Sequence, residues 1–181
     1  MLYGKLDLLD RLSAYKVRPA DNRPPYKFET GTLNHEGIAG TRAAVEYLAQ
    51  LAGVKGTRRE CVVSGMAVIE EYERTLSARL ISGLQTIKGL KIWGITNLSQ
   101  LDRRVPTVSF TLEGYSPREI AEYLGQHGIF VWDGNYYALA IMERLGLQPK
   151  GGMVRVGLVH YNTAEEVERL LAELQVLVKS G

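Results

Sequence analysis

The sequence of 181 residues has a single cysteine, Cys61, so an internal disulfide and a cysteine-based metal cluster are both excluded. Its three histidines, His35, His127 and His160, show no metal-ligand spacing, and we predict no metal site. Such sparing use of cysteine also favours a reducing, cytoplasmic compartment.

Excess charge and long apolar runs are missing as well. The 22 Lys and Arg nearly balance the 20 Asp and Glu, the net charge is +2, and no basic run occurs. We therefore predict no nucleic-acid partner. No apolar run approaches the roughly 18 residues that a membrane span needs. Charged residues interrupt the first twelve positions, MLYGKLDLLDRL, where a signal peptide would carry its apolar core. We expect no membrane association.

What is present suits a folded globular protein. Apolar residues make up 45% of the sequence and charged residues 23%, both close to globular averages. The length is enough for one ordinary domain to build a core without disulfides. Tyrosine is the prominent aromatic residue, with ten copies against three Phe and two Trp.

The first part of the chain, residues 1–87, is predicted to be helix and loop. Apolar periodicity indicates helices over residues 5–14, 34–52 and 58–87. Thr57 and Glu60 form a capping box at the start of the third helix. The proline-containing segment 16–32 has no periodicity, and loops of that length tend to be functional or to belong to an interface.

The second part, residues 88–181, has a ββαβαβα pattern. The predicted strands cover residues 90–95, 105–112, 129–132 and 153–161, and the predicted helices cover 116–128, 135–147 and 163–177. Capping boxes stand at Ser116 with Glu119 and at Thr163 with Glu166. We predict the α/β class, with an α+β module in which helices cover one face of a small mixed sheet.

A phosphate site is one interpretation of the segment FETGTLNHEG. Thr30, Thr32 and Asn34 directly precede a predicted helix, whose free N–H groups and dipole favour an anion. The same three residues are equally explained as simple helix caps.

Arg155 stands inside the apolar strand MVRVGLV, where a charge is costly unless it is paired. Strand alternation allows it to point outward, opposite Val154 and Val156. Its guanidinium then either faces solvent or binds a carboxylate.

The turn after the third predicted strand carries four further polar or aromatic side chains, namely Asp133, Asn135, Tyr136 and Tyr137. Turns of this kind often hold functional loops. The alternative is a helix cap with packed tyrosines.

Three segments together resemble, in order and spacing, the C-terminal part of class V aminotransferases of the cysteine desulfurase type, which are fold-type I pyridoxal-phosphate enzymes. MLYGKLDLLDRL resembles the strand and helix that follow the cofactor lysine. FETGTLNHEGIAG is similar to the family's F-E-x-G-T-x-N segment, and MVRVGLVHYNTAEEVERLLAEL resembles its closing strand and helix. The resemblance implies pyridoxal 5'-phosphate as cofactor, an amino-acid substrate and a homodimer.

The resemblance also implies roles for individual residues. Thr32, with Gly31 and Asn34 beside it, matches the segment that reaches the cofactor phosphate of the other subunit. Arg155 matches the arginine that binds the substrate α-carboxylate, and Asn135 and Tyr137 are the further predicted substrate contacts. Residues 1–87 would be a remnant of the large domain with its interface arm and helices, and residues 88–181 the small domain.

Two departures from the family pattern affect catalysis. None of the eight lysines follows a histidine, as the family's Schiff-base lysine does, so we expect that lysine and the aspartate that pairs with the pyridine nitrogen to lie upstream. Tyr137 stands near the position of the desulfurase cysteine, and a phenol with a pKa near 10 is a poor nucleophile. Cys61 belongs to another segment. We therefore assign no catalytic residue and expect the chain to need an upstream large-domain half and to be inactive alone.

Two other interpretations remain open. The chain is alternatively a non-catalytic α+β module that binds a ligand or a protein, because fold does not decide function. Tyr137, Asp133 and Arg155 are alternatively a small acid–base site. We also expect self-association through exposed apolar surface.

Overall fold

A computed structural model describes residues 3–180, apart from the side chain of Ser180. The chain divides into two compact units, Met1–Leu48 and Ala49–Gly181. This boundary lies upstream of the one expected at residue 87, because the long helix α3 (Arg58–Gln85) packs on the sheet of the second unit. The assignment of residues 1–87 to a large domain and 88–181 to a small domain stays a prediction.

The first unit is organised by a buried lysine. Its elements are α1 (Leu6–Arg11), the 3-10 turn η1 (Tyr26–Phe28) and most of α2 (His35–Gln50). Lys27 is buried, and its Nζ donates hydrogen bonds to the carbonyls of Asp10 and Leu12 at 3.0 and 2.9 Å. A cation at the end of a helix satisfies carbonyls that lack helical partners. These hydrogen bonds join the segment 16–32 to the C-terminal end of α1.

The second unit contains a four-stranded sheet. Its strands are β1 (Leu90–Trp93), β2 (Thr107–Leu112), β3 (Trp132–Gly134) and β4 (Met153–Gly157). The strand order is β1-β2-β4-β3, and every neighbouring pair is antiparallel. The prediction of a mixed sheet is therefore wrong. The strand β4 lies between β2 and β3 and runs antiparallel to both, so β2 and β3 are not neighbours and form no parallel pair.

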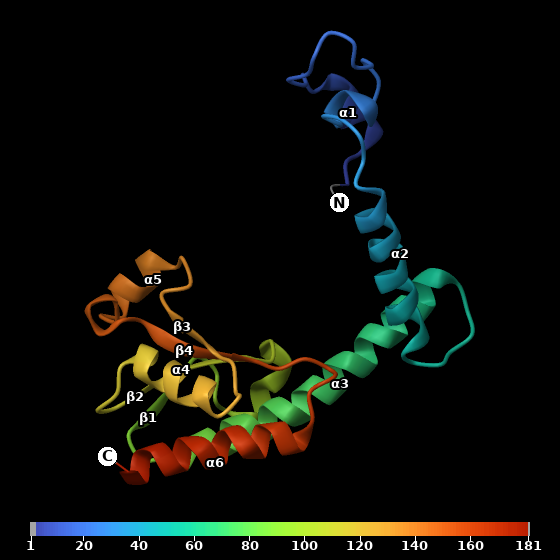
Figure 1. Ribbon diagram of the computed structural model, residues 1–181. Coiled ribbons are helices and arrows are strands. Elements are labelled where there is room, and N and C mark those ends of the chain that lie inside the picture. The colour runs from blue at the N-terminus through green and yellow to red at the C-terminus, as the bar shows by residue number, and fades with distance from the viewer. Residues whose placement is uncertain (1–2, 181) are drawn as a thin grey trace. The chain divides into compact units, whose positions relative to one another are not determined.

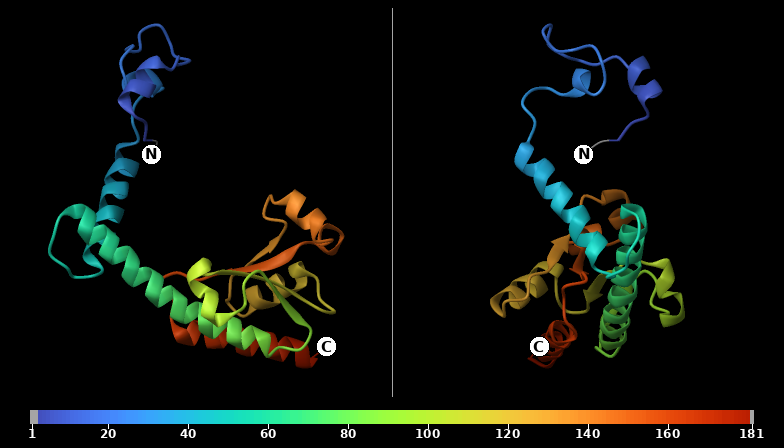
Figure 2. Two further views of the ribbon diagram at one scale, coloured as in Figure 1. Left: turned by 180° about the vertical axis from the view of Figure 1, so that it is seen from behind. Right: turned by 90° about the vertical axis from the view of Figure 1, so that its right-hand side faces the viewer.

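Three helices cover one face of this sheet: α3, α4 (Pro117–Gln126) and α6 (Ala164–Ser180). Figures 1 and 2 show α3 and α6 side by side beneath the strands. Fully buried apolar side chains from both layers form the core, among them Leu80, Leu84, Val108, Phe110, Ile120, Leu124, Val154 and Leu174. Of the helices predicted in residues 88–181, those at 116–128 and 163–177 pack on this face as predicted and correspond to α4 and α6. The same prediction is wrong for the helix at 135–147, and α3 was not expected in this layer.

The fourth helix of this unit, α5 (Leu139–Arg144), lies on the opposite face of the sheet together with the 3-10 turn η3 (Gln148–Lys150) (Figure 1). A small second core of Met142, Leu147 and Met153 forms there. Met153 precedes the core residue Val154, and adjacent strand residues point to opposite faces.

Local sequence signals are confirmed at all three capping boxes, at Thr57, Ser116 and Thr163. Another 3-10 segment, η2 (Leu98–Arg103), connects β1 and β2. Two expected elements differ, since β3 begins at the end of the predicted strand 129–132 and α5 is much shorter than predicted. No helix in residues 3–180 is both long and apolar enough to cross a bilayer.

Candidate functional site

Arg155 lies in the middle of β4, opposite Ser109 of β2 on one side and Trp132 of β3 on the other. Val154 and Val156 are buried in the core, and Arg155 is exposed on the other face of the sheet. The predicted alternation along this strand is confirmed. The guanidinium therefore belongs to the face on which α5 and its loop lie.

Tyr136 supports the Arg155 side chain. The Arg155 guanidinium carbon lies 4.8 Å from the centre of the Tyr136 ring, in cation–π geometry. The Tyr136 hydroxyl donates a hydrogen bond to the Met153 carbonyl on the same strand. Burial raises the pKa of Tyr136 far above its ordinary value, against the opposing effect of the Arg155 charge. The phenol thus remains neutral and holds its ring beside the guanidinium.

Arg155 has no carboxylate partner among the residues that the structure describes. The carboxylate on the adjacent strand, Asp133, is engaged elsewhere, because its Oδ1 lies 3.5 Å from Arg118 Nη1 of α4. Asp133 pairs with Val154 in the sheet and so points to the core side. The guanidinium is consequently available to a carboxylate from outside the chain.

The loop between β3 and α5 has an unusual backbone. Tyr136 and Tyr137 both have positive φ angles, of 54° and 59°. A bulky residue in the left-handed region is strained, and such strain concentrates at functional sites. The Asn135 side-chain oxygen accepts a hydrogen bond from the Tyr137 N–H at 3.0 Å, which stabilises the turn. Tyr137 itself is fully exposed.

A pocket of about 370 Å³ adjoins this loop, and Trp132, Asn135, Tyr136 and Tyr137 are among the residues that line it. The structure thus brings the predicted residues Asn135 and Tyr137 onto the same loop as Tyr136, the support of Arg155. Sequence reasoning missed the role of Tyr136, because cation–π stacking between a strand and a loop leaves no spacing signal.

The predicted phosphate segment belongs to the first unit. Gly31, Thr32 and Asn34 are all exposed. The Asn34 side-chain oxygen accepts a hydrogen bond from Gly37 N–H at 2.7 Å, so Asn34 caps α2, as one of the two interpretations expected. Contact of these residues with a phosphate stays a prediction.

The remaining candidate residues lie outside the loop. Cys61 is in the first turn of α3, where its thiol donates to the Val54 carbonyl at 3.5 Å. His160 Nδ1 lies 4.0 Å from Glu73 Oε1. Within residues 3–180 no cluster of three or more His, Cys, Asp or Glu side chains is arranged to hold a metal ion.

The family model for class-V aminotransferases matches residues 8–170. The chain therefore belongs to the class-V aminotransferase family.

Two similar proteins are named as a cysteine desulfurase and a probable cysteine desulfurase. One from Klebsiella pneumoniae (strain 342) is 33% identical over 191 aligned residues, which cover 99% of this chain and 42% of the relative. A probable cysteine desulfurase from Pyrococcus abyssi is 34% identical over 169 residues, which cover 93% of this chain and 36% of the relative. The chain thus spans less than half the length of these relatives.

Solved structures agree in fold. The apo cysteine desulfurase of Thermococcus onnurineus NA1 has a TM-score of 0.71 at 32% identity, covering 88% of this chain and 35% of that one. The Escherichia coli cysteine desulfurase CsdA has a TM-score of 0.77 at 22% identity, covering 98% of this chain and 42% of that one, and so shows the shared fold alone.

Proposed function

We propose that this chain is the C-terminal portion of a pyridoxal-phosphate enzyme that acts on an amino acid, and that Arg155 binds the substrate α-carboxylate. The observation that carries the proposal is the state of Arg155. It stands exposed on the face of the sheet that carries α5, supported by the Tyr136 ring and without an internal carboxylate partner among the described residues. A guanidinium fork suits a carboxylate because it can form two parallel hydrogen bonds.

Enzymes of this family use pyridoxal 5'-phosphate. When bound, this cofactor supplies an electron sink for chemistry at the amino-acid α-carbon. Residues of this chain fit its phosphate, because the start of the 16-residue helix α2 offers backbone N–H groups and Thr32 offers an exposed hydroxyl. Thr32, Gly31 and Asn34 would hold the phosphate of a partner subunit in a homodimer, with Asn34 contributing mainly as the cap that orders the helix start.

Within this proposal, each side chain near Arg155 has a distinct role. Arg155 binds and orients the carboxylate, while the Tyr136 ring supports the guanidinium through the cation–π contact. The raised pKa of Tyr136 keeps its phenol protonated, so Tyr136 positions rather than accepts a proton. Asn135 and Tyr137 line the pocket of about 370 Å³ beside the Tyr136 ring, and we assign them as further substrate contacts.

We further propose that this loop forms no persulfide. Tyr137 stands near the position at which the resemblance expects a cysteine, and Cys61 lies on α3 instead. The lysine that anchors the cofactor would come from an upstream large-domain half. The chain by itself is expected to be inactive.

The test is an assembly of this chain with an upstream half from a relative that carries the anchoring lysine. Addition of an amino acid should change the visible absorption of the bound cofactor. Arg155→Ala should raise the amino-acid concentration at half-maximal change about 10- to 100-fold, since a charge-assisted hydrogen bond contributes roughly 1.5–3 kcal/mol.

Arg103→Ala is the matched control, because Arg103 is an exposed arginine on η2. It should titrate like the parent. Arg155→Lys, which keeps the charge and loses the fork, should be intermediate. A response of Arg155→Ala equal to that of the parent would show that the carboxylate binds elsewhere.

A further inference from the structure

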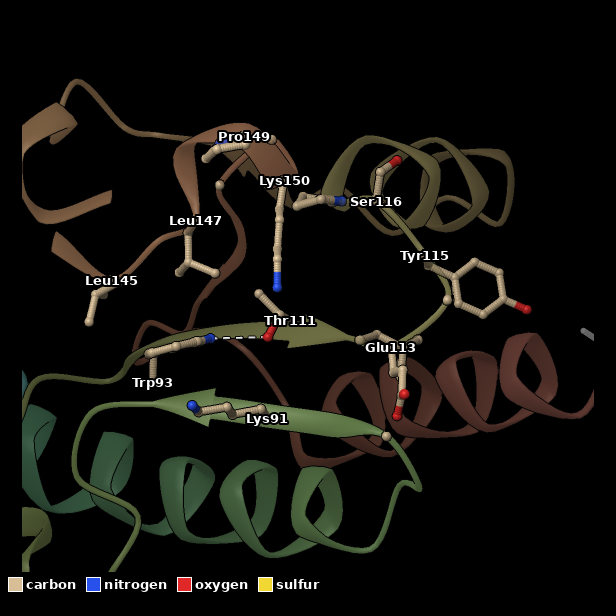
Figure 3. A pocket seen from close by; sticks show the side chains of 16 residues that line it. Lys91, Trp93, Thr111, Glu113, Tyr115, Ser116, Leu145, Leu147, Pro149 and Lys150 are labelled. Atoms are coloured by element: carbon tan, nitrogen blue, oxygen red, sulfur yellow. Dashed lines mark hydrogen bonds between the residues drawn. The ribbon is translucent and has the colours of Figure 1, made fainter. Parts of the chain in front are cut away.

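A second concave surface lies on the same side of the sheet as α5. It is a groove of about 1020 Å³ between the strands β1 and β2 and the segment that contains η3 (Figure 3). The floor of the groove is formed by Lys91, Trp93 and Thr111. These residues alternate along the strands with side chains that pack in or against the main core, namely Ile92, Phe110 and Leu112. The proposed role of Arg155 makes no use of this groove.

The floor of the groove is ordered by side-chain contacts. Lys91 and Thr111 are paired across β1 and β2. The Trp93 indole N–H donates a hydrogen bond to Thr111 Oγ1 at 3.1 Å, which sets the orientation of the ring. Lys91 Nζ lies 3.9 Å from the centre of that ring, so its ammonium group is held at the floor by a cation–π contact.

The opposite wall provides a second ammonium group and an apolar surface. Lys150 extends from η3 into the groove toward Thr111 (Figure 3). Leu145, Leu147 and Pro149 line the groove on the same side, and Leu147 is anchored in the second core. Apolar walls with a few convergent polar groups are typical of small-molecule sites.

The charge of the groove is unbalanced. Neither Lys91 nor Lys150 forms an ion pair within the described part of the chain. Glu113 is the one carboxylate among the described lining residues, and it lies beside Gly89, which directly precedes β1. One ammonium group at the floor of the groove and a second one on the Lys150 side chain favour an anion in this groove. Lysine binds phosphate as a point charge, and two ammonium groups match the charge of about −1.5 to −2 on a phosphomonoester better than the single charge of a carboxylate.

We propose that this groove binds a small organic phosphate, a phosphomonoester of an apolar group. The phosphate lies between Lys91 and Lys150, and the apolar group lies against Leu147 and Pro149. The site is separate from the carboxylate contact at Arg155 and does not depend on it.

The test uses the whole chain with Trp132→Phe, which leaves Trp93 as the only reporter of the two tryptophans. Titration with phenyl phosphate should produce a saturable change in Trp93 fluorescence. Lys91→Gln and Lys150→Gln should each raise the Kd about fivefold or more, because each removes one charge from the phosphate contact. Inorganic phosphate, which lacks the apolar group, should bind more weakly than phenyl phosphate.

Lys55→Gln is the matched control, because Lys55 is an exposed lysine of the same unit outside the groove. It should leave the Kd unchanged within about twofold. Lys150→Arg, which keeps the charge, should retain most of the binding and thereby separate loss of charge from loss of folding. The proposal is overturned if no saturable change occurs, if Lys55→Gln weakens binding as much as Lys150→Gln, or if Arg155→Ala abolishes the response.

Discussion

Gly152 provides the sharpest test of how the Arg155 loop is held. This residue is buried next to β4, has a φ angle of +87°, and lies directly against β3. A Cβ atom at this position would stand 2.1 Å from the Gly134 carbonyl oxygen and 3.0 Å from the Asn135 nitrogen. Gly152→Ala therefore forces apart the backbone that positions the start of the loop.

The cost has two parts. An alanine in the left-handed region costs about 1–2 kcal/mol. Relief of the overlap with a backbone carbonyl requires a main-chain shift, for which overpacking costs of roughly 1–3 kcal/mol are typical. We expect Gly152→Ala to lower the free energy of unfolding by about 2–5 kcal/mol in total.

The neighbouring residue supplies the control. Gly151 has a φ angle of +81°, but a Cβ there would meet Pro117 Cδ at 3.7 Å, an ordinary contact. Gly151→Ala should cost only the conformational part, about 1–2 kcal/mol. Urea unfolding followed by far-UV circular dichroism measures both variants. Equal losses for the two variants would refute the close approach of Gly152 to Gly134.

Two further predictions concern single side chains. Tyr136→Phe loses the hydrogen bond to the Met153 carbonyl and should lower the free energy of unfolding by about 1 kcal/mol in urea titrations. Tyr136→Leu also loses the ring contact with Arg155 and should lower it by roughly 0.5–1 kcal/mol more. Equal stability of Tyr136→Phe and the parent would contradict the hydrogen bond. Glu119 accepts hydrogen bonds from the backbone N–H and the hydroxyl of Ser116, and these bonds lower the pKa of its carboxyl below the ordinary 4.5. The ionised Glu119 therefore stabilises the fold fully above pH 4.5, and this stabilisation is lost as the pH falls through the lowered pKa. The melting-temperature difference between the parent and Glu119→Gln should therefore shrink from about pH 6 to about pH 3, and a constant difference would be inconsistent with this origin.

Local signals in the sequence were reliable where one helix turn decides the structure. The pairs Thr57 with Glu60 and Ser116 with Glu119 form capping boxes as predicted, because both partners lie within four consecutive residues. The outward direction of Arg155 followed from alternation along β4 for the same reason. The predicted helix 135–147 failed in its first turn, where Tyr136 and Tyr137 adopt positive φ angles that their residue type disfavours.

The sequence by itself determined the helices other than α5, the three capping boxes and the position of Arg155 on a strand. These depend on residues that are close along the chain. Only the tertiary structure decided that β4 runs antiparallel between β2 and β3, that Gly152 meets Gly134, and that the ring of Tyr136 lies beside the Arg155 guanidinium. Each of these depends on the register and packing of strands and loops distant in sequence, which no local spacing encodes.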